Sequence, residues 1–491
     1  MKSILSIVIL LSFFNLASNA QEKEVLSLTL GEVIRMAQEQ SPSAVSARIN
    51  RESAEWNYKY YKANYLPSVT LTSNPNYSRS INKITQPDGT FKYLEQNSLS
   101  TDLSLSIEQN LALTGGTFSL SSSLDRSDFF REGQDKETSY STNPVYVTYS
   151  QSLFGVNSLK WDRRIEPIAY RQACKQYNET MELIASNACS YFFSLASAQV
   201  NAEIASFNYA NADTLYRFAQ GRYGIGTITE NEMLQLEINK LNAESDLINA
   251  RFSVEDNMQA LRSFLALQDD VDIHVVIEDS VNHFMVSADE ALELAYENNP
   301  DPEYFKKVRL QNDRNVANAK ANAGLKANIY LRFGLTQTGP DLQTAYRDPI
   351  NSQGASISLS LPILDWGRGR GQVKMAKSNR ELSNMNIDQS ERNFEENVYR
   401  LVRQFNQQAA KMNILAKTDI TAERRFEVAR RLFLMGKSTT LELNTATSEK
   451  DAARRSRISA LSNYWSLYYT LRSLTGYDFE KGEKIEWEYK K

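Results

Sequence analysis

Two stretches of the chain carry the hydrophobic spacing of very long helices. Residues 168–220 and 372–435 contain neither glycine nor proline, and the second would extend roughly 96 Å as a single helix. Apolar side chains recur in it every seven residues, in two rows: Ile387, Phe394 and Leu401, and Val398, Phe405 and Met412. Leu234, Leu241 and Ile248 show the same spacing in a shorter segment. An ordinary bundle core would give similar rows, but the length favours coiled coils.

Six shorter segments alternate apolar and polar side chains, as β-strands with two different faces do. In the clearest, residues 99–107, apolar side chains alternate with Ser100, Asp102, Ser104 and Ser106. The others lie at 118–124, 145–153, 329–335 and 357–363, and a weaker one begins at Val69. Their lengths approach the roughly 9–11 residues of a tilted transmembrane strand, although a half-buried sheet in a soluble protein would share the pattern.

The connections between these segments favour a barrel in a membrane. Residues 114–116 (Thr-Gly-Gly) form a tight turn, whereas residues 82–97 and 127–143 are longer polar loops. Short turns on one side and long loops on the other are typical of outer-membrane barrels.

The chain contains two copies of one design. Residues 29–42 resemble residues 287–300, an offset of 258 positions, and both stretches end in proline. Later matches share an offset of 210: Gly226 with Gly436, Thr229 with Thr439, and residues 261–264 with 471–474. The offsets differ because the first copy holds about 48 additional residues. Each copy is therefore expected to be one structural unit, repeated about a pseudo-symmetry axis.

The first residues have the pattern of an export signal. Lys2 supplies a positive charge, residues 4–16 are mostly apolar but too short to span a bilayer, and residues 18–20 are small enough for cleavage. We expect residues 1–20 to be removed and Gln21 to begin the mature chain. No later apolar run approaches 18 residues, so the sequence predicts no transmembrane helix.

Composition excludes several classes of function. The net charge is -4, so no positive excess points to a nucleic-acid partner. Two cysteines and two histidines exclude a disulfide scaffold and most zinc clusters. Cys174 and Cys189 are expected to be small buried residues, and His274 and His283 to be incidental rather than ligands. The spacing suggests neither a nucleophile beside a base nor paired catalytic acids, so no enzyme, cofactor or metal is expected. The basic run at 454–457 is expected to be solvated or to pair between helices.

Four short motifs accompany the duplication. Residues 361–368 (Leu-Pro-Ile-Leu-Asp-Trp-Gly-Arg) lie where a strand segment gives way to a long helix, and Leu66–Pro67 lies where a helix gives way to a strand. Asn299–Pro300 breaks a helix, and Gly226 and Gly436 mark two helix reversals. Together they resemble the strand-to-helix signature, corner, helix break and helix tips of the TolC-type outer-membrane efflux channel family, over nearly the whole mature chain. At the second corner, Leu325–Lys326 departs from this pattern.

The resemblance implies the fold and the partners. The fold would be α+β and internally duplicated, with a trimeric outer-membrane β-barrel continued by a long periplasmic α-helical barrel. The partners would be two further copies of the chain, outer-membrane lipid, a periplasmic adaptor (a membrane fusion protein) and an inner-membrane transporter of the RND or ABC type. The function would be passive export, in efflux or type I secretion, without nucleic acid. The alternative is a structural periplasmic coiled coil or a surface adhesin without a pore.

The expected residue ranges follow from the two copies. They are a signal peptide (1–20); a leading helix (21–66), strands with an extra hairpin (67–154) and a long helix pair (155–270); a linker (271–286); a second leading helix (287–326), strands (327–365) and long helix pair (366–476); and a charged C-terminal tail (477–491). The family has two strands per copy, and residues 97–126 add a hairpin. We expect six strands per chain and eighteen per trimer, rather than four with the hairpin set aside.

The resemblance also points to site residues at the helix tips. Six positions after Gly226 and Gly436 stand Glu232 and Glu442, where the family has a gating aspartate, but its arginine and second aspartate are not matched. Three copies of each glutamate would ring the pore, favour cations and raise some of their pKa values by repulsion; otherwise they are solvated helix glutamates. The turns themselves resemble the family's adaptor-docking tips, or lack a partner: Gly226, Thr227, Gly436, Lys437, Ser438 and Thr439.

Overall fold

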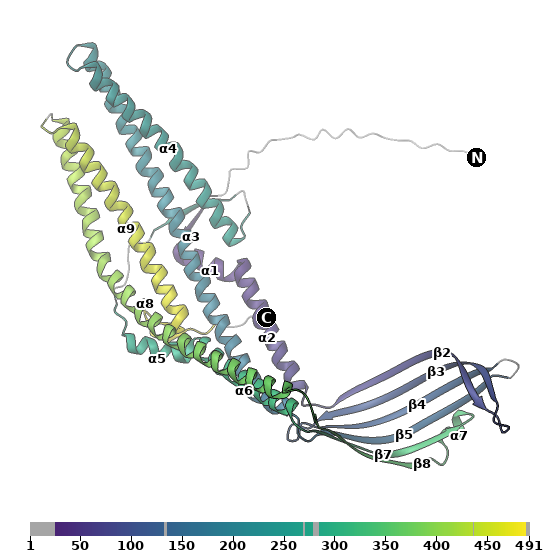
Figure 1. The fold of residues 1–491 in the computed structure, drawn as a ribbon. Helices are drawn as coiled ribbons and strands as arrows, with labels where there is room; N and C mark the ends of the chain where they lie inside the picture. The colour runs from purple at the N-terminus through teal and green to yellow at the C-terminus, as the bar shows by residue number, and fades with distance from the viewer. Residues whose placement is uncertain (1–24, 132–134, 269–270, 278–283, 436, 488–491) are drawn as a thin grey trace, which may run out of the picture. The chain divides into compact units, whose positions relative to one another are not determined.

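The computed structural model describes residues 25–131, 135–268, 271–277, 284–435 and 437–487 (Figure 1). The expected signal peptide, His283 and Gly436 lie outside these described residues. The chain divides into two compact units. We call residues up to 45, 183–284 and 405–469 the tip unit, and residues 46–182, 285–404 and 470 onward the sheet unit. No described helix is long and apolar enough to cross a membrane.

The main sheet of the sheet unit is antiparallel and has six strands over the described residues. In order, they are β2 (Ser68–Thr85), β3 (Phe91–Asn110), β4 (Thr117–Arg131), β5 (Glu137–Ser152), β7 (Lys326–Gly339) and β8 (Ile350–Ser360). A short helix, α7 (Leu342–Tyr346), lies between β7 and β8 in sequence. The chain therefore adopts the expected six strands rather than four, and β2 and β8 form the edges of the sheet.

The alternating pattern gives this sheet two chemically different faces. On one face, Leu103 of β3 pairs with Leu124 of β4. On the other face, Ser104 pairs with Ser123. An apolar face toward lipid and a small polar face toward water are what the wall of a membrane barrel needs.

Four long helices lie wholly or partly in the same unit: α2 (Pro42–Ala63) from residue 46, α3 (Ser158–Gly224) up to residue 182, α6 (Asp301–Ala323), and α8 (Arg368–Leu434) up to residue 404. A tyrosine stack joins α2 to α3, with ring centroids 4.5 Å apart. Arg314 of α6 pairs with Asp162 of α3 at 2.8 Å, and Arg309 of α6 pairs with Asp388 of α8 at 2.8 Å. The order of these helices is therefore α2–α3–α6–α8, with α2 and α8 at the edges. The shorter α5 (Ala288–Asn298) ends at the expected Asn299–Pro300 break.

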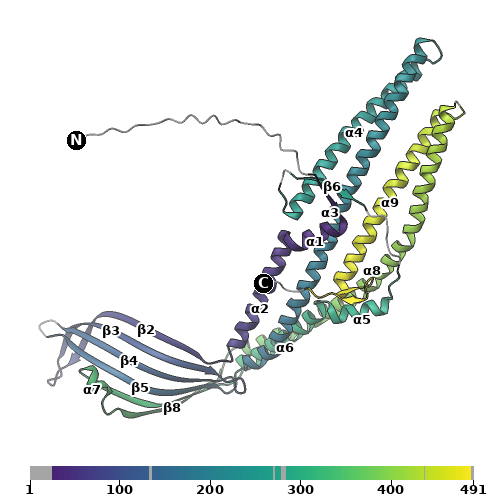
Figure 2. The ribbon, with the colours of Figure 1, turned by 180° about the vertical axis from the view of Figure 1, so that it is seen from behind.

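The tip unit holds two more long helices, α4 (Glu230–Leu265) and most of α9 (Thr440–Thr475), beside parts of α3 and α8 (Figure 2). Lys240 of α4 pairs with Asp213 of α3 at 2.8 Å. The Asn208 amide of α3 donates to Asp451 of α9 at 3.0 Å. Ion pairs of α9 with Asp419 of α8 complete the series. The order here is α4–α3–α9–α8, with α4 and α8 at the edges.

A small parallel sheet also belongs to the tip unit. Strand β1 (Val25–Thr29) pairs with β6 (Asp272–Val276), and α1 (Leu30–Gln40) follows β1 directly. Thr29 and Glu32 form a capping box at the start of α1. Strand β6 lies in the segment expected to be a linker, and it carries His274 exposed.

The seven-residue apolar rows are buried on one helix and exposed on another. All six row residues of α8 are buried, from Ile387 to Met412. On α4, by contrast, Leu234, Leu241 and Ile248 are 44%, 56% and 64% exposed. The heptad spacing on α8 therefore packs within the chain, whereas the row on α4 is left on the surface of the tip unit.

Candidate functional site at the helix tips

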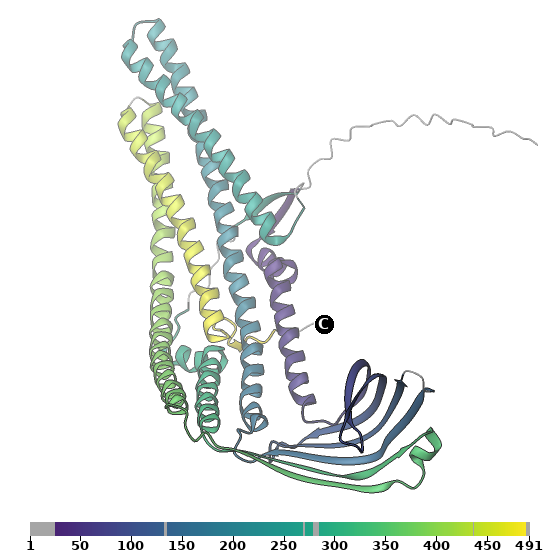
Figure 3. The same cartoon turned by 45° about the vertical axis from the view of Figure 1, so that its right-hand side comes forward.

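The first helix tip, between α3 and α4, is closed by hydrogen bonds around Gly226. The backbone N–H of Thr227 donates to the carbonyl of Arg222 at 2.9 Å, and the Thr227 hydroxyl donates to the same oxygen at 2.9 Å. Gly226 has a φ of 72°, a left-handed conformation that favours glycine. Figure 3 shows this reversal at the end of the α3–α4 pair.

The second tip, between α8 and α9, repeats the same bond 210 positions later. The backbone N–H of Lys437 donates to the carbonyl of Leu432 at 2.9 Å, as Thr227 does to Arg222. Gly436 lies outside the described residues, but Lys437, Ser438 and Thr439 follow it as an exposed or half-exposed turn. The duplication in the sequence thus extends to the hydrogen bonds of the tips.

Both predicted aperture glutamates cap the helices that return from the tips. The Thr229 hydroxyl accepts from the N–H of Glu232 at 3.2 Å, and the Glu232 carboxylate accepts from the N–H of Thr229 at 2.8 Å. Thr439 and Glu442 make the same reciprocal pair, at 3.2 and 3.3 Å. These are capping boxes. The family resemblance does not indicate Thr229, but the Thr-x-x-Glu spacing in both copies is the signal that identifies it.

The caps lower the pKa values of both carboxyl groups. Bonds from the backbone and hydroxyl of Thr229 lower the pKa of Glu232, and bonds from Ser438 and Thr439 lower the pKa of Glu442. Both side chains are exposed, so they are ionised at neutral pH and available as charges. The rise in pKa expected from a ring of carboxylates requires three chains, and it stays a prediction.

Buried polar side chains also join helices within the tip unit. Asp419 of α8 is buried and accepts from Arg454 and Arg457 of α9 at 3.4 and 2.9 Å. Lys450 of α9 lies between two phenylalanine rings of α3 and α8, 4.4 and 4.3 Å from their centroids. The basic run of α9 thus pairs between helices, which is one of the two roles expected from the sequence.

The strand-to-helix motif at residues 361–368 forms a corner with unusual backbone geometry. The Asp365 carboxylate accepts from the N–H groups of Gly369 and Gly367 at 2.8 and 2.9 Å, and these bonds lower its pKa. Gly367 has a φ of 84°, and Trp366 before it has a φ of 54°. The motif is therefore a corner that starts α8, and its aspartate satisfies the first free N–H groups of the helix.

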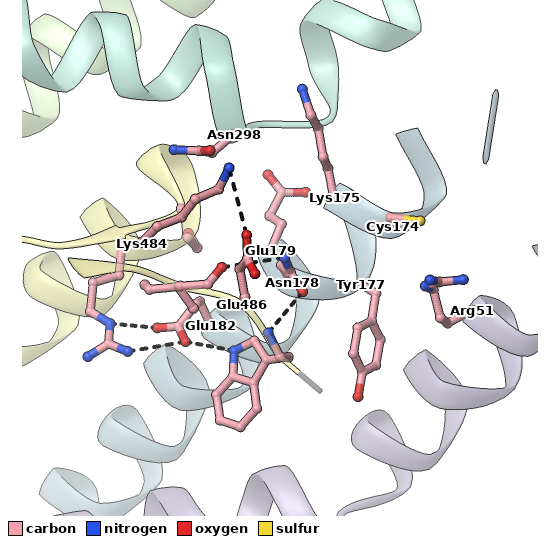
Figure 4. Close-up of a pocket in the computed structure, with 15 residues that line it drawn as sticks. Arg51, Cys174, Lys175, Tyr177, Asn178, Glu179, Glu182, Asn298, Lys484 and Glu486 are labelled. Carbon is pink, nitrogen blue, oxygen red and sulfur yellow. Dashed lines mark hydrogen bonds and ion pairs between the residues drawn. The ribbon is translucent and has the colours of Figure 1, made fainter. Parts of the chain in front are cut away.

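The C-terminal segment folds back onto α3 beside a cavity of about 330 Å³ in the sheet unit. Strands β9 (Tyr477–Asp478) and β10 (Glu483–Lys484) form a small hairpin there. Glu182 of α3 is buried and accepts from Arg472 at 2.7 Å and from the Trp487 indole N–H at 3.0 Å (Figure 4). Arg472 also pairs with Asp478 at 2.8 Å. These bonds give the described part of the expected C-terminal tail a structural role.

No metal or thiol chemistry is evident in the described ranges. Within them, no three His, Cys, Asp or Glu side chains are grouped as a metal site requires. Cys174 and Cys189 are not joined in a disulfide; Cys174 is half-buried and Cys189 is buried.

Apolar rows are exposed on the edge helices of each unit. In the tip unit, the row on α4 is matched by a row at seven-residue multiples on α8 and the residue after it: Ile414, Val428 and Met435. In the sheet unit, exposed apolar side chains lie at the same spacing on both edges: Ile49 and Trp56 on α2, and Met375 and Leu382 on α8. Rows of this kind on outermost helices indicate contact with helices of another chain.

Comparison with known proteins identifies the family. The family model of outer membrane efflux proteins matches residues 33–267 and 292–477, which covers both copies. Comparison with curated protein sequences finds no match. The Campylobacter jejuni CmeC outer membrane channel has the same fold, with 16% identity, a TM-score of 0.66 and coverage of 94% of this chain and 87% of that one.

Two further channels have a similar structure. The open state of the Neisseria gonorrhoeae MtrE outer membrane channel is 16% identical, with a TM-score of 0.61 and coverage of 91% and 88%. The outer membrane protein VceC from Vibrio cholerae is 14% identical, with a TM-score of 0.59 and coverage of 92% and 96%. In this fold the barrel closes only when chains assemble as a trimer. The chain belongs to the outer membrane efflux protein family, and it is the non-enzymatic outer-membrane channel of a tripartite efflux or secretion system, with a helical extension in the periplasm.

Proposed function

We propose that the two helix tips dock a periplasmic adaptor, and that Glu232 and Glu442 ring the aperture of the channel. The adaptor would be a membrane fusion protein, and it would link the channel to an inner-membrane transporter of the RND or ABC type. The energy of that transporter drives export, and the channel conducts passively. Family membership supports the choice of partners.

The equivalence of the two tips carries the aperture proposal. Glu232 and Glu442 occupy the same position in two capping boxes, and both carboxylates are exposed. A trimer would present three copies of each around one axis. Rings of carboxylates favour cations at a constriction.

Exposed apolar side chains at the tips support the docking proposal. Ile225 and Leu441 are 75% and 76% exposed, beside the polar turn residues Thr227 and Ser438. A few apolar anchors surrounded by polar groups are typical of an interface with another protein.

Single-channel conductance of the purified trimer in a planar bilayer tests the aperture. The variant Glu232→Gln with Glu442→Gln removes the charges and keeps the caps, because glutamine also serves in a capping box. We expect small, cation-selective currents from the native channel and loss of the cation preference in the variant. The matched control, Thr229→Ala with Thr439→Ala, weakens the caps but keeps the carboxylates, so its selectivity should persist. Unchanged selectivity in the glutamine variant would mean that the constriction lies elsewhere in the channel.

Photo-crosslinking in intact cells tests the docking. A photoreactive amino acid at Ile225 should capture one periplasmic protein of the membrane fusion class, whereas the same probe at Asn242 of α4, away from the turn, should not. If the channel conducts but the probe at Ile225 gives no crosslink, the protein is still a channel and the proposed docking site is wrong.

A further inference from the structure

Apolar side chains are exposed where the strands of the sheet unit meet its helices (Figure 1). Leu113, in the turn between β3 and β4, is 95% exposed, and Ile363 and Trp366, between β8 and α8, are 94% and 90% exposed. Phe154, after β5, is exposed as well. A group of such side chains marks contact with lipid or with another protein. We call this region the corner, made of residues 62–67, 111–116, 153–164, 320–326 and 361–374.

Hydrogen bonds fix the backbone that displays these side chains. The Asn157 side-chain amide donates to the carbonyls of Ala112 and Leu113 at 2.9 and 3.4 Å. The side-chain oxygen of Asn157 accepts from the N–H of Lys160, in the first turn of α3, at 3.0 Å. One side chain thus holds the apolar turn of Leu113 against the start of a helix.

The corner is also strongly basic. Its acidic side chains are two, and both have partners: Asp162 pairs with Arg314, and Asp365 accepts from two backbone N–H groups. Its cations are nine, all exposed, and none forms an ion pair with another described residue: Lys62, Lys160, Arg163, Arg164, Lys320, Lys326, Arg368, Arg370 and Lys374. The corner therefore carries positive charge that the chain itself does not neutralise.

Six of these cations lie in the first two turns of α3 and α8, where the helix itself does not favour them. Neither helix has an acidic residue in its first turn, whereas α4, α5, α6 and α9, which begin elsewhere, each have at least one. Because the N-terminal end of a helix carries a partial positive charge, cations there are disfavoured and anions are favoured. A negatively charged surface beside the corner would offset this cost.

The corner lies at the periplasmic side of the outer membrane, because the sheet belongs to the barrel and the helices extend into the periplasm. The headgroup layer on each side of a bilayer is about 5–8 Å thick. Two turns of helix extend about 11 Å. The apolar side chains of the corner therefore lie level with the edge of the hydrocarbon, and the cations lie level with the headgroups.

We propose that the corner binds the anionic phospholipids of the leaflet that faces the periplasm. Its apolar side chains enter the edge of the hydrocarbon, and its cations contact the phosphates of the headgroups. A neighbouring chain does not account for this surface, because Leu113 and Phe154 adjoin central strands, and only Ile363 and Trp366 lie at an edge of the sheet. The contact fixes the depth of the barrel, so that the helical tunnel starts at the membrane surface.

Fluorescence quenching in vesicles tests the contact. The full-length trimer carries an NBD fluorophore at Leu113→Cys, in a Cys174→Ser and Cys189→Ala background. The vesicles contain phosphatidylethanolamine and phosphatidylglycerol, and one lipid at a time carries a nitroxide near the headgroup. We expect both lipids to quench the label, with an apparent association about tenfold stronger for phosphatidylglycerol. The same label at Gln311→Cys on α6, about 18 Å from the corner, should be quenched by neither.

Absence of quenching at Leu113 would overturn the proposal, since the turn would then face water or protein. Equal quenching by the two lipids would reject the anionic partner. Both results come from a chain that keeps all nine cations, so they do not require any charge variant to fold.

A charge variant identifies the groups responsible. Lys160→Gln, Arg163→Gln and Arg164→Gln together should lower the preference for phosphatidylglycerol from about tenfold to about twofold, while quenching persists. The matched control, Arg392→Gln, Arg400→Gln and Arg403→Gln, removes the same charge from α8 far from the corner and should keep the preference. An unchanged preference in the first variant would mean that these cations do not contact the headgroups. None of these readouts depends on adaptor docking or on the charges of Glu232 and Glu442.

Discussion

The carboxylates of Glu232 and Glu442 each have a local role, which is to cap a helix, and a proposed role in the assembly, which is to place negative charge at the aperture. The local role follows from distance alone, because each accepts a hydrogen bond from the threonine that caps its helix. The proposed role needs only the negative charge. Glutamine keeps the first and loses the second, so the two roles can be separated without disturbing the turn.

Acidification should loosen the first tip. Because the folded-state pKa of Glu232 is lowered, its contribution to stability is present above the ordinary value of 4.5 and is lost as the pH falls through the lowered value. A nitroxide at Ile228→Cys should therefore become more mobile below pH 4.5. Adding Glu232→Gln should remove this pH dependence, and a line shape that responds equally in both proteins would assign the titration to another group.

Gly367 and Gly371 should respond in opposite directions to the same substitution. Gly367 has a left-handed φ, so Gly367→Ala should cost about 1–2 kcal/mol in the free energy of unfolding. Gly371 lies within α8 with open space around it, so Gly371→Ala should stabilise by about 0.5–1 kcal/mol. Denaturant unfolding in detergent measures both. Equal effects would mean that the corner is not constrained as described.

Arg472 holds the C-terminal segment through two buried carboxylates. Arg472→Met should cost about 3–5 kcal/mol in the free energy of unfolding, since it leaves Glu182 and Asp478 buried without their cation. Burial already raises the pKa of Glu182, so the variant should regain stability as the pH is lowered from 7 and Glu182 takes up a proton. Arg455→Met on the exposed face of α9 is the control, with a change below about 0.5 kcal/mol. A comparable loss there would point to a general effect of removing arginine.

Helices and strands were predictable from the sequence wherever one periodic pattern extends over many residues. The rows of α8 and the alternating strands have this property. The expected loops at residues 82–97 and 127–143 were wrong in extent, because strands β2, β3, β4 and β5 run through most of them. Pairings between distant segments were not predictable. Strand β6 is too short to show a period, and its partner β1 lies almost 250 positions earlier. The pairing of Asp419 has no local signal in the sequence, because its two arginine partners are 35 and 38 positions away.

The row on α4 shows a different limit of prediction. Its seven-residue spacing predicts that the row packs against another helix, but the sequence does not show whether that helix belongs to the same chain. Leu241→Asp should therefore leave the helical content of the chain unchanged and prevent the trimer, as seen by circular dichroism and native mass spectrometry. Asn242→Asp, one residue away on a polar face, should still form the trimer. Loss of helix in the first variant would place the row inside the chain's own core.

The duplication makes the two edges of the chain, one formed by each copy, similar but not identical. Each copy contributes a helix tip with the same capping box, whereas only the first copy contributes the extra hairpin. In the sheet, in the sheet-unit helices and in the tip-unit helices, the edge on the first-copy side differs from the edge on the second-copy side. An interface between such edges joins unlike surfaces, and a ring closes when three copies complete the rotation.

Mixing two blocked chains tests this arrangement of the whole assembly. Leu241→Asp blocks the α4 edge, and Val428→Asp blocks the α8 edge. Each variant alone should be monomeric in detergent, because every contact needs an intact α4 edge on one chain and an intact α8 edge on the other. Together they can join once, through the intact α4 edge of one and the intact α8 edge of the other, and cannot close a ring. Native mass spectrometry should show heterodimers only in the mixture. If the interface instead joined like edges, each variant would form homodimers on its own, and the threefold arrangement of these edges would have to be abandoned.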